Sequence, residues 1–264
     1  MTARQEVDRP TLAGMVLLLA PLLTMAHEIG GHGSACLLTG GTIEAIGAYY
    51  VDCHSATALA GRIVALAGTV ADLMVGAVAF LLWRWAQSAS LRIFLWMVFT
   101  CKLLVAAGYP LFSGVTGIGD WGVGMQGGLG PLPYPWVWRV ALALLGLAAY
   151  LGVMRLASRT LDAMIGGTEA SVRLRRLIPM TLYLGSGAVA IIVGLFNPVG
   201  LFILLASAIA STFGGMAGLF NVAFRQPPSE PAREVVLARQ PVLIGLGVAA
   251  VIAFALVLGQ TLDV

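Results

Sequence analysis

The stretch His27-Glu28-Ile29-Gly30-Gly31-His32 places two imidazoles and a carboxylate within one apolar run that extends from 11 to 39. Ionisable side chains are costly in such a run, and they usually face a protein interior, a water-filled cavity or a ligand. A His-Glu pair with a second His shortly downstream on a helix is typical of a zinc site, in which the Glu acts as general base on a metal-bound water. This stretch is therefore our candidate site.

The spacing of the two histidines departs from the usual helical spacing. Positions four apart on a helix differ by about 40° and share a face, whereas His27 and His32 are five apart and differ by about 140°. A one-residue π-bulge would restore a common face, and Gly30 and Gly31 supply the backbone freedom for it. Alternatively, Glu28 and His32 are four apart and can form a carboxylate–imidazole site without a bulge. We favour the bulge because it leaves Glu28 free as a base.

A catalytic zinc needs three protein ligands and one open position, so a third ligand must come from elsewhere in the chain. Asp120 is the best candidate, because it follows a Gly-rich stretch whose glycines allow close backbone approach. His54 is the alternative ligand, although beside Asp52 and Cys53 it can equally be a solvated loop residue. The His/carboxylate donor set suits Zn²⁺, and it suits iron as well.

The composition is that of a membrane protein. Of the 264 residues, 59% are hydrophobic and 10% are charged, and the mean hydropathy is +0.93. A soluble domain carries about 25% charged residues, so the surplus apolar surface here must face lipid. The Arg residues fall in short connections between apolar runs rather than in one patch, which argues against a nucleic-acid partner.

Apolar runs of about 20 residues, the length that spans a bilayer, predict an all-α bundle of about seven transmembrane helices in a single domain, 1–264. The spans are expected at 11–39, 59–84, 91–112, 134–157, 177–196, 198–224 and 240–261. Arg-bearing and Arg-free connections alternate along the chain, which predicts a cytoplasmic N-terminus and an external C-terminus. We expect a multi-pass protein of a bacterial inner membrane, surrounded by lipid and by membrane-protein substrates or partner subunits.

Two further ionisable groups, Asp72 and Lys102, are predicted at membrane depth. An unpaired charge there is costly, so one interpretation is an ion pair between neighbouring helices, and the other is a proton-relay or substrate role. Cys36 and Cys53 are both external in the predicted topology. They can therefore form a disulfide in an oxidising compartment or remain as two free thiols.

Three segments resemble the site-2 protease family, zinc metalloproteases that cut within membranes. The run 27–41 resembles the family's His-Glu-Leu-Gly-His-Ala segment, and 64–73 (Val-Ala-Leu-Ala-Gly-Thr-Val-Ala-Asp-Leu) resembles its Ala-Gly-Pro-x-Ala-Asn segment. Tyr109-Pro110-Leu111-Phe112, followed by Gly119-Asp120-Trp121, lies where the family has an Asn-x-x-Pro loop ending in Asp-Gly. The resemblance predicts a metalloprotease-like core over 11–122, with additional helices over 134–261.

This resemblance implies zinc held by His27, His32 and Asp120, Glu28 as the catalytic group, and a membrane-embedded peptide as substrate. The chain departs from the family pattern in one residue inserted between the histidines. It also has Thr69 where the family has Pro, Asp72 where the family has Asn, and no Asn before the last motif.

Two other hypotheses remain open from the sequence. The inserted residue and the missing Asn favour a catalytically inactive relative that serves as a subunit or assembly factor of a membrane complex. A transporter, with Glu28, Asp72 and Lys102 along its pathway, is the third hypothesis.

Overall fold

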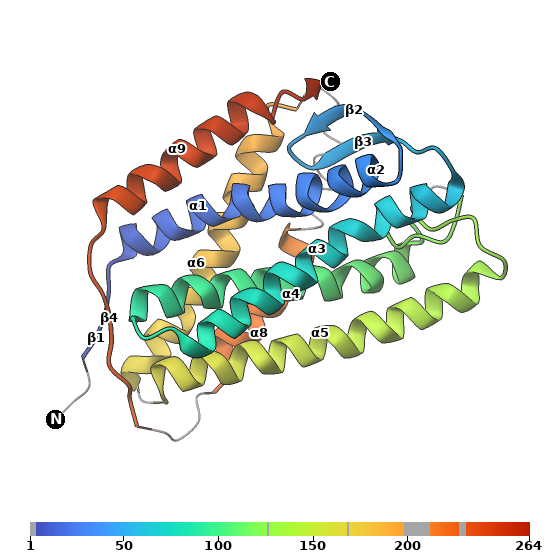
Figure 1. The fold of residues 1–264 in the computed structure, drawn as a ribbon. Helices are drawn as coiled ribbons and strands as arrows, with labels where there is room; N and C mark the ends of the chain where they lie inside the picture. The colour runs from blue at the N-terminus through green and yellow to red at the C-terminus, as the bar shows by residue number, and fades with distance from the viewer. Residues whose placement is uncertain (1–3, 126, 168, 198–211, 227–230) are drawn as a thin grey trace.

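The computed structural model describes residues 4–125, 127–167, 169–197, 212–226 and 231–264, and it is a helical bundle with a small sheet at each end (Figure 1). The predicted helical bundle is confirmed, and the short strands were not predicted. Most of the span expected at 198–224 lies outside the described residues, so that span stays a prediction.

The first span is one continuous rod made of three helical segments. It consists of α1 (Arg9–His27), a π-helical turn η1 (Glu28–Gly33) and α2 (Ser34–Leu38). Asp8 caps its start, because its carboxylate accepts hydrogen bonds from the backbone N–H and the hydroxyl of Thr11 at 2.9 and 2.7 Å. The candidate site thus lies in the second half of this rod.

Three long helices pack side by side beneath this rod: α3 (Ala58–Trp85), α4 (Ala89–Thr116) and α5 (Pro135–Ile165) (Figure 1). Helix α4 is central and contacts both α3 and α5. The indole N–H of Trp96 on α4 donates to the Ala157 carbonyl and to the Thr160 hydroxyl on α5, each at 3.1 Å. These bonds hold the first part of α4 against α5.

The remaining helices are α6 (Glu169–Gly194), α8 (Gly218–Phe224) and α9 (Pro241–Val257). Helix α6 crosses the bundle and contacts α1, while α9 packs along α1 on its other side (Figure 1). The cavity described below is enclosed partly by α6, so this crossing helix forms one wall of the site.

Two small sheets bring the termini to opposite ends of the bundle. At one end β5 (Leu262–Asp263) pairs with β2 (Thr42–Gly47), which forms a hairpin with β3 (Tyr50–His54) in the order β3-β2-β5. At the other end β1 (Gln5–Val7) pairs with β4 (Val235–Leu237). In the described part of the chain, the Arg-free connections after α2 and after α4 lie at the end with the C-terminus, and the Arg-bearing connections after α3 and after α5 lie at the end with the N-terminus (Figure 1).

Five helices are long and apolar enough to cross a membrane, judged by length and composition. They are Arg9–Leu38, Ala58–Trp85, Ala89–Thr116, Pro135–Ile165 and Ser171–Gly194. Helix α9 has a similar composition but only 17 residues. The outward faces of α3 and α5 expose large apolar side chains such as Met74 and Leu144, which are more than half exposed. A soluble monomer rarely exposes apolar surface on this scale, so these faces indicate a membrane protein.

Candidate metal centre

The π-helical turn brings the two histidines of the first span together. Because η1 absorbs one extra residue, His27 and His32 point to the same side, and their Nε2 atoms lie 3.2 Å apart. This confirms the predicted bulge. The alternative Glu28–His32 pair is not formed, since the Glu28 carboxylate makes no hydrogen bond or ion pair with any residue that the structure describes.

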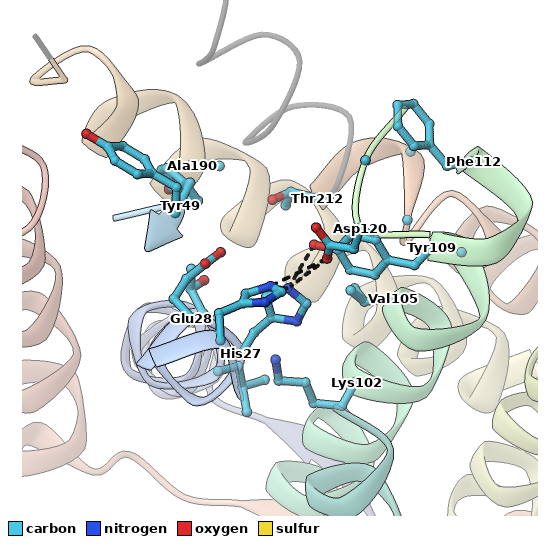
Figure 2. Close-up of a pocket in the computed structure, with 18 of the residues that line it drawn as sticks. His27, Glu28, Tyr49, Lys102, Val105, Tyr109, Phe112, Asp120, Ala190 and Thr212 are labelled. Atoms are coloured by element: carbon cyan, nitrogen blue, oxygen red, sulfur yellow. Dashed lines mark hydrogen bonds and ion pairs between the residues drawn. The ribbon is translucent and has the colours of Figure 1, made fainter. Parts of the chain in front are cut away.

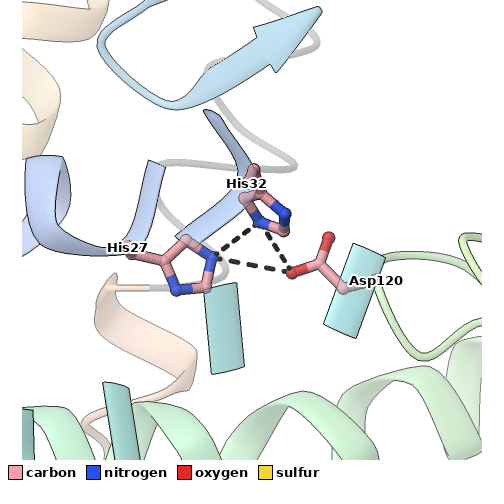
Figure 3. A group of neighbouring side chains, drawn as sticks. All are labelled: His27, His32 and Asp120. Atoms are coloured by element: carbon pink, nitrogen blue, oxygen red, sulfur yellow. Dashed lines mark hydrogen bonds and ion pairs between the residues drawn. The ribbon is translucent and has the colours of Figure 1, made fainter. Parts of the chain in front are cut away.

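Asp120 completes a cluster of three (Figure 3). Its Oδ2 lies 3.6 Å from His27 Nε2 and 3.5 Å from His32 Nε2. The carboxylate comes from the loop after α4, where Gly117 and Gly119 take positive φ angles of 84° and 85°. These conformations suit glycine, and they turn the chain back toward the histidines. The structure therefore brings the three predicted ligands together.

Hydrogen bonds fix which nitrogen of each imidazole faces the cluster. His32 Nδ1 lies 2.7 Å from the carbonyl oxygen of Val64, and His27 Nδ1 lies 2.9 Å from Oδ2 of Asp72. Both partners are acceptors, so each Nδ1 carries the proton and each Nε2 presents a lone pair. Metal-bound histidines are commonly oriented by such carboxylate and carbonyl partners.

The geometry of the cluster fits a small divalent cation. Zinc–ligand distances of about 2.0–2.1 Å place two ligands of a tetrahedral ion about 3.3 Å apart, and the observed separations are 3.2, 3.5 and 3.6 Å. Asp120 Oδ2 is buried and has no hydrogen-bond partner in the described part of the chain. Three acceptor atoms, one of them anionic, thus converge on one point.

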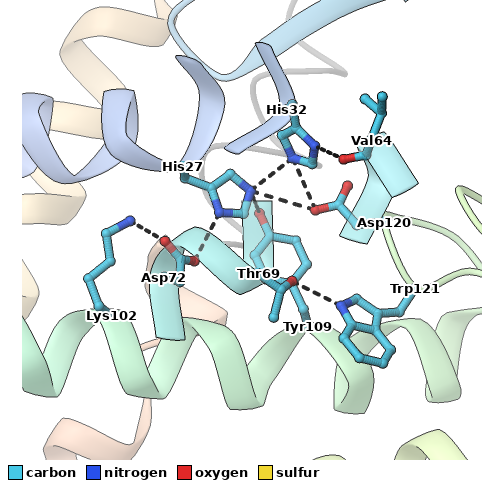
Figure 4. A network of polar contacts seen from close by, with 9 residues as sticks. All are labelled: His27, His32, Val64, Thr69, Asp72, Lys102, Tyr109, Asp120 and Trp121. Carbon is cyan, nitrogen blue, oxygen red and sulfur yellow. Dashed lines mark hydrogen bonds and ion pairs between the residues drawn. The ribbon is translucent and has the colours of Figure 1, made fainter. Parts of the chain in front are cut away.

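Asp72 links the cluster to a buried ion pair (Figure 4). Its Oδ1 accepts from the Lys102 ammonium, and its Oδ2 faces His27. Asp72 is fully buried and Lys102 is only 3% exposed. The predicted Asp72–Lys102 pair between α3 and α4 is confirmed, and the same carboxylate orients a histidine on α1.

Gly68 on α3 lies directly against both imidazoles, and its role was not predicted. A Cβ added there would lie 2.5 Å from His32 Nε2 and 2.6 Å from His27 Nε2. The neighbouring contact is equally close, since a Cβ on Gly31 would lie 2.5 Å from the Gly68 Cα. Glycine at both positions lets η1 and α3 approach closely enough for the histidines to face the cluster. The one signal in the sequence was that Gly68 lies within the segment 64–73, which resembles a glycine-containing segment of the site-2 protease family.

A cavity of about 930 Å³ opens beside the cluster (Figure 2). Glu28, which is 7% exposed, lines it together with His27 and His32. Strand β3 and helices α4 and α6 supply much of the remaining wall. The predicted base is therefore placed next to the candidate metal ligands, in a space that can admit another molecule.

The β2–β3 hairpin covers part of this cavity and is tied to the metal-site helix. Cys36 on α2 and Cys53 on β3 form a disulfide, which settles the alternative that the sequence left open. Tyr49 lies at the tip of the hairpin, where burial, together with the nearby Glu28, raises its pKa. His54, the alternative ligand, lies exposed on β3 opposite Thr42 and does not join the cluster.

Comparisons with known proteins give no assignment. No family model matches the chain, and neither the curated proteins nor the solved structures give a significant match.

Proposed function

We propose that this protein is an intramembrane zinc metalloprotease of the site-2 type. The observation that carries the proposal is that a three-ligand cluster and an unpartnered buried carboxylate, Glu28, line the same cavity. Glu28 and the two histidines lie on an apolar helix that is long enough to span a membrane. His27, His32 and Asp120 would hold the metal. The same donor set accepts iron, so the identity of the metal belongs to the proposal.

A divalent cation at this cluster would supply Lewis acidity, which polarises a carbonyl and makes water a better nucleophile. The Glu28 carboxylate has no hydrogen-bond or ion-pair partner among the described residues, so it is free to take the proton of an attacking water. The same group can then deliver that proton to the leaving amine of a cleaved peptide bond. Asp72 and Val64 hold the two imidazoles in the tautomer that this chemistry needs.

The membrane placement is also part of the proposal. We infer a multi-pass protein of a bacterial inner membrane, with the Arg-bearing end of the bundle cytoplasmic. The metal centre, the hairpin and the C-terminus then lie toward the external side. The disulfide between Cys36 and Cys53 supports this orientation, because disulfides persist in oxidising compartments.

An inactive relative that assembles a membrane complex was the main competing hypothesis, and the inserted residue between the histidines was one of its two reasons. The π turn absorbs that residue and keeps both Nε2 atoms in place. The insertion therefore gives no geometric argument against catalysis. The missing family Asn is the remaining reason for that hypothesis, and the activity measurement below tests it.

The test compares wild-type protein with Glu28→Gln after reconstitution into liposomes with a membrane-protein extract from cells that lack this protein. Mass spectrometry of newly formed peptide termini reports cleavage, and elemental analysis reports metal. We expect both proteins to contain metal and only the wild type to create termini within apolar segments. Glu44→Gln, at an exposed glutamate on β2, is the matched control and should remain active. Equal cleavage by Glu28→Gln would contradict the proposal.

A further inference from the structure

Tyr109 on α4 places a phenol hydroxyl at the metal cluster, in a position that the chemistry above does not use. Its ring stacks on the His27 imidazole, with centroids 5.0 Å apart and planes 9° apart. The hydroxyl lies 3.1 Å from His27 Nε2, which is its one hydrogen-bond partner within the described part of the chain (Figure 4). Figure 2 shows the same side chain reaching into the cavity next to Asp120.

The direction of this hydrogen bond follows from the orientation of His27. Because Nδ1 carries the proton that Asp72 accepts, Nε2 is an acceptor and the Tyr109 hydroxyl must be the donor. A cation bound by the cluster would use the same Nε2 lone pair. The hydroxyl and the cation would therefore compete for one atom, and metal binding would leave the hydroxyl as a free donor beside the cluster.

We propose that Tyr109 is a catalytic residue, whose hydroxyl donates a hydrogen bond to the substrate carbonyl oxygen as negative charge develops on it. This inference rests on the proposed metalloprotease function. A donor already positioned beside the site of charge development stabilises that charge without reorganisation. No bond to Tyr109 is made or broken, and the phenol keeps its proton throughout.

The competition for Nε2 predicts that removing the Tyr109 hydroxyl raises the affinity for zinc, which a purely structural role would not do. In Tyr109→Phe the lone pair is free before metal arrives, so zinc affinity, measured by competition with a chromogenic chelator, should rise by about twofold to tenfold, the range of one ordinary hydrogen bond. If the hydroxyl merely supported the fold, its loss would leave affinity unchanged or lower it. If Tyr109 were itself a metal ligand, affinity would fall steeply.

The second readout uses an anion in place of the substrate oxygen. Acetohydroxamate, which places a negatively charged oxygen on a metal, is titrated into the Co²⁺-loaded protein and followed by the cobalt absorption bands. Loss of one hydrogen bond to a charged group should weaken its binding to Tyr109→Phe by about tenfold to a hundredfold. Unchanged binding would overturn the inference.

Tyr150→Phe is the matched control. The Tyr150 hydroxyl donates to the Gly215 carbonyl at 2.9 Å and accepts from the Gly218 N–H at 2.7 Å, so it serves to join α5 to the segment before α8. Its loss should change neither zinc affinity nor acetohydroxamate affinity. Wild-type protein that takes up no metal would overturn the proposed function together with this inference. If the wild-type protein binds metal but Tyr109→Phe binds zinc more weakly than the wild type does, this inference alone would be overturned.

Discussion

Replacing Gly68 with alanine should displace the metal ligands without changing any of them. The added Cβ would lie 2.5 Å from His32 Nε2 and 2.6 Å from His27 Nε2, whereas ordinary contact begins at 3.4 Å. To reach ordinary contact, His32 Nε2 would have to move 0.9 Å and His27 Nε2 0.8 Å away from the added Cβ. Metal–ligand distances tolerate only about 0.2 Å, so this shift exceeds what the cluster can absorb.

We expect zinc affinity to fall by about a hundredfold or more in Gly68→Ala, since changes that merely disturb the partners of metal ligands cost about tenfold to a hundredfold. Overpacking of the α3–η1 contact should also lower the free energy of unfolding by about 1–3 kcal/mol. Chelator competition measures the affinity, and thermal unfolding in detergent measures the stability, so a folded variant can be distinguished from an unfolded one.

Gly152→Ala on α5 is the control, because a Cβ there meets nothing within 4 Å. This variant should bind zinc as the wild type does, and alanine should favour its helix slightly. A folded Gly68→Ala protein with zinc affinity within about threefold of the wild type would refute the reasoning, since such an affinity change corresponds to less than about 1 kcal/mol. The histidines would then not be held as the structure places them.

Two further predictions concern the surroundings of the cluster. Asp72→Asn should lower zinc affinity by about tenfold to a hundredfold, because it weakens the hydrogen bond that orients His27. It should also reduce thermal stability, because it leaves the buried Lys102 charge without its anion. Unchanged zinc affinity in chelator competition would show that Asp72 does not support the metal site. Replacing Cys36 and Cys53 with serine should lower the free energy of unfolding by about 3 kcal/mol, the expected value for a closed loop of this length. Equal melting temperatures of the wild-type protein with and without a reductant would contradict this predicted contribution of the disulfide.

The sequence predicted those parts of the site that depend on local spacing or on the cost of burying charge. A shared metal site for His27 and His32, five residues apart, favoured a helical irregularity, and the glycines between them indicated where it would lie. Asp72 and Lys102 could be paired because an isolated charge at that depth is costly. Asp120 could be proposed as a ligand because zinc chemistry requires a third donor and the glycines before it allow close backbone approach.

Other features depend on contacts between helices that no local pattern specifies. Gly68 looks like any small residue of an apolar helix until α3 is placed against η1, and Tyr109 looks like an ordinary aromatic residue until α4 is placed beside His27. The pairing of Cys36 with Cys53 depends on the register of the hairpin, which hydropathy does not encode. The exposed position of His54 follows from the same strand register.

The most direct test of the metal centre is elemental analysis of purified wild-type protein beside a His27→Ala, His32→Ala double variant. Because the cluster consists of three acceptor atoms around one point, we predict about one zinc per chain in the wild type and none in the variant. Iron in place of zinc would keep the centre and change its chemistry. Wild-type protein that holds no metal, or a double variant that holds as much metal as the wild type, would contradict the account.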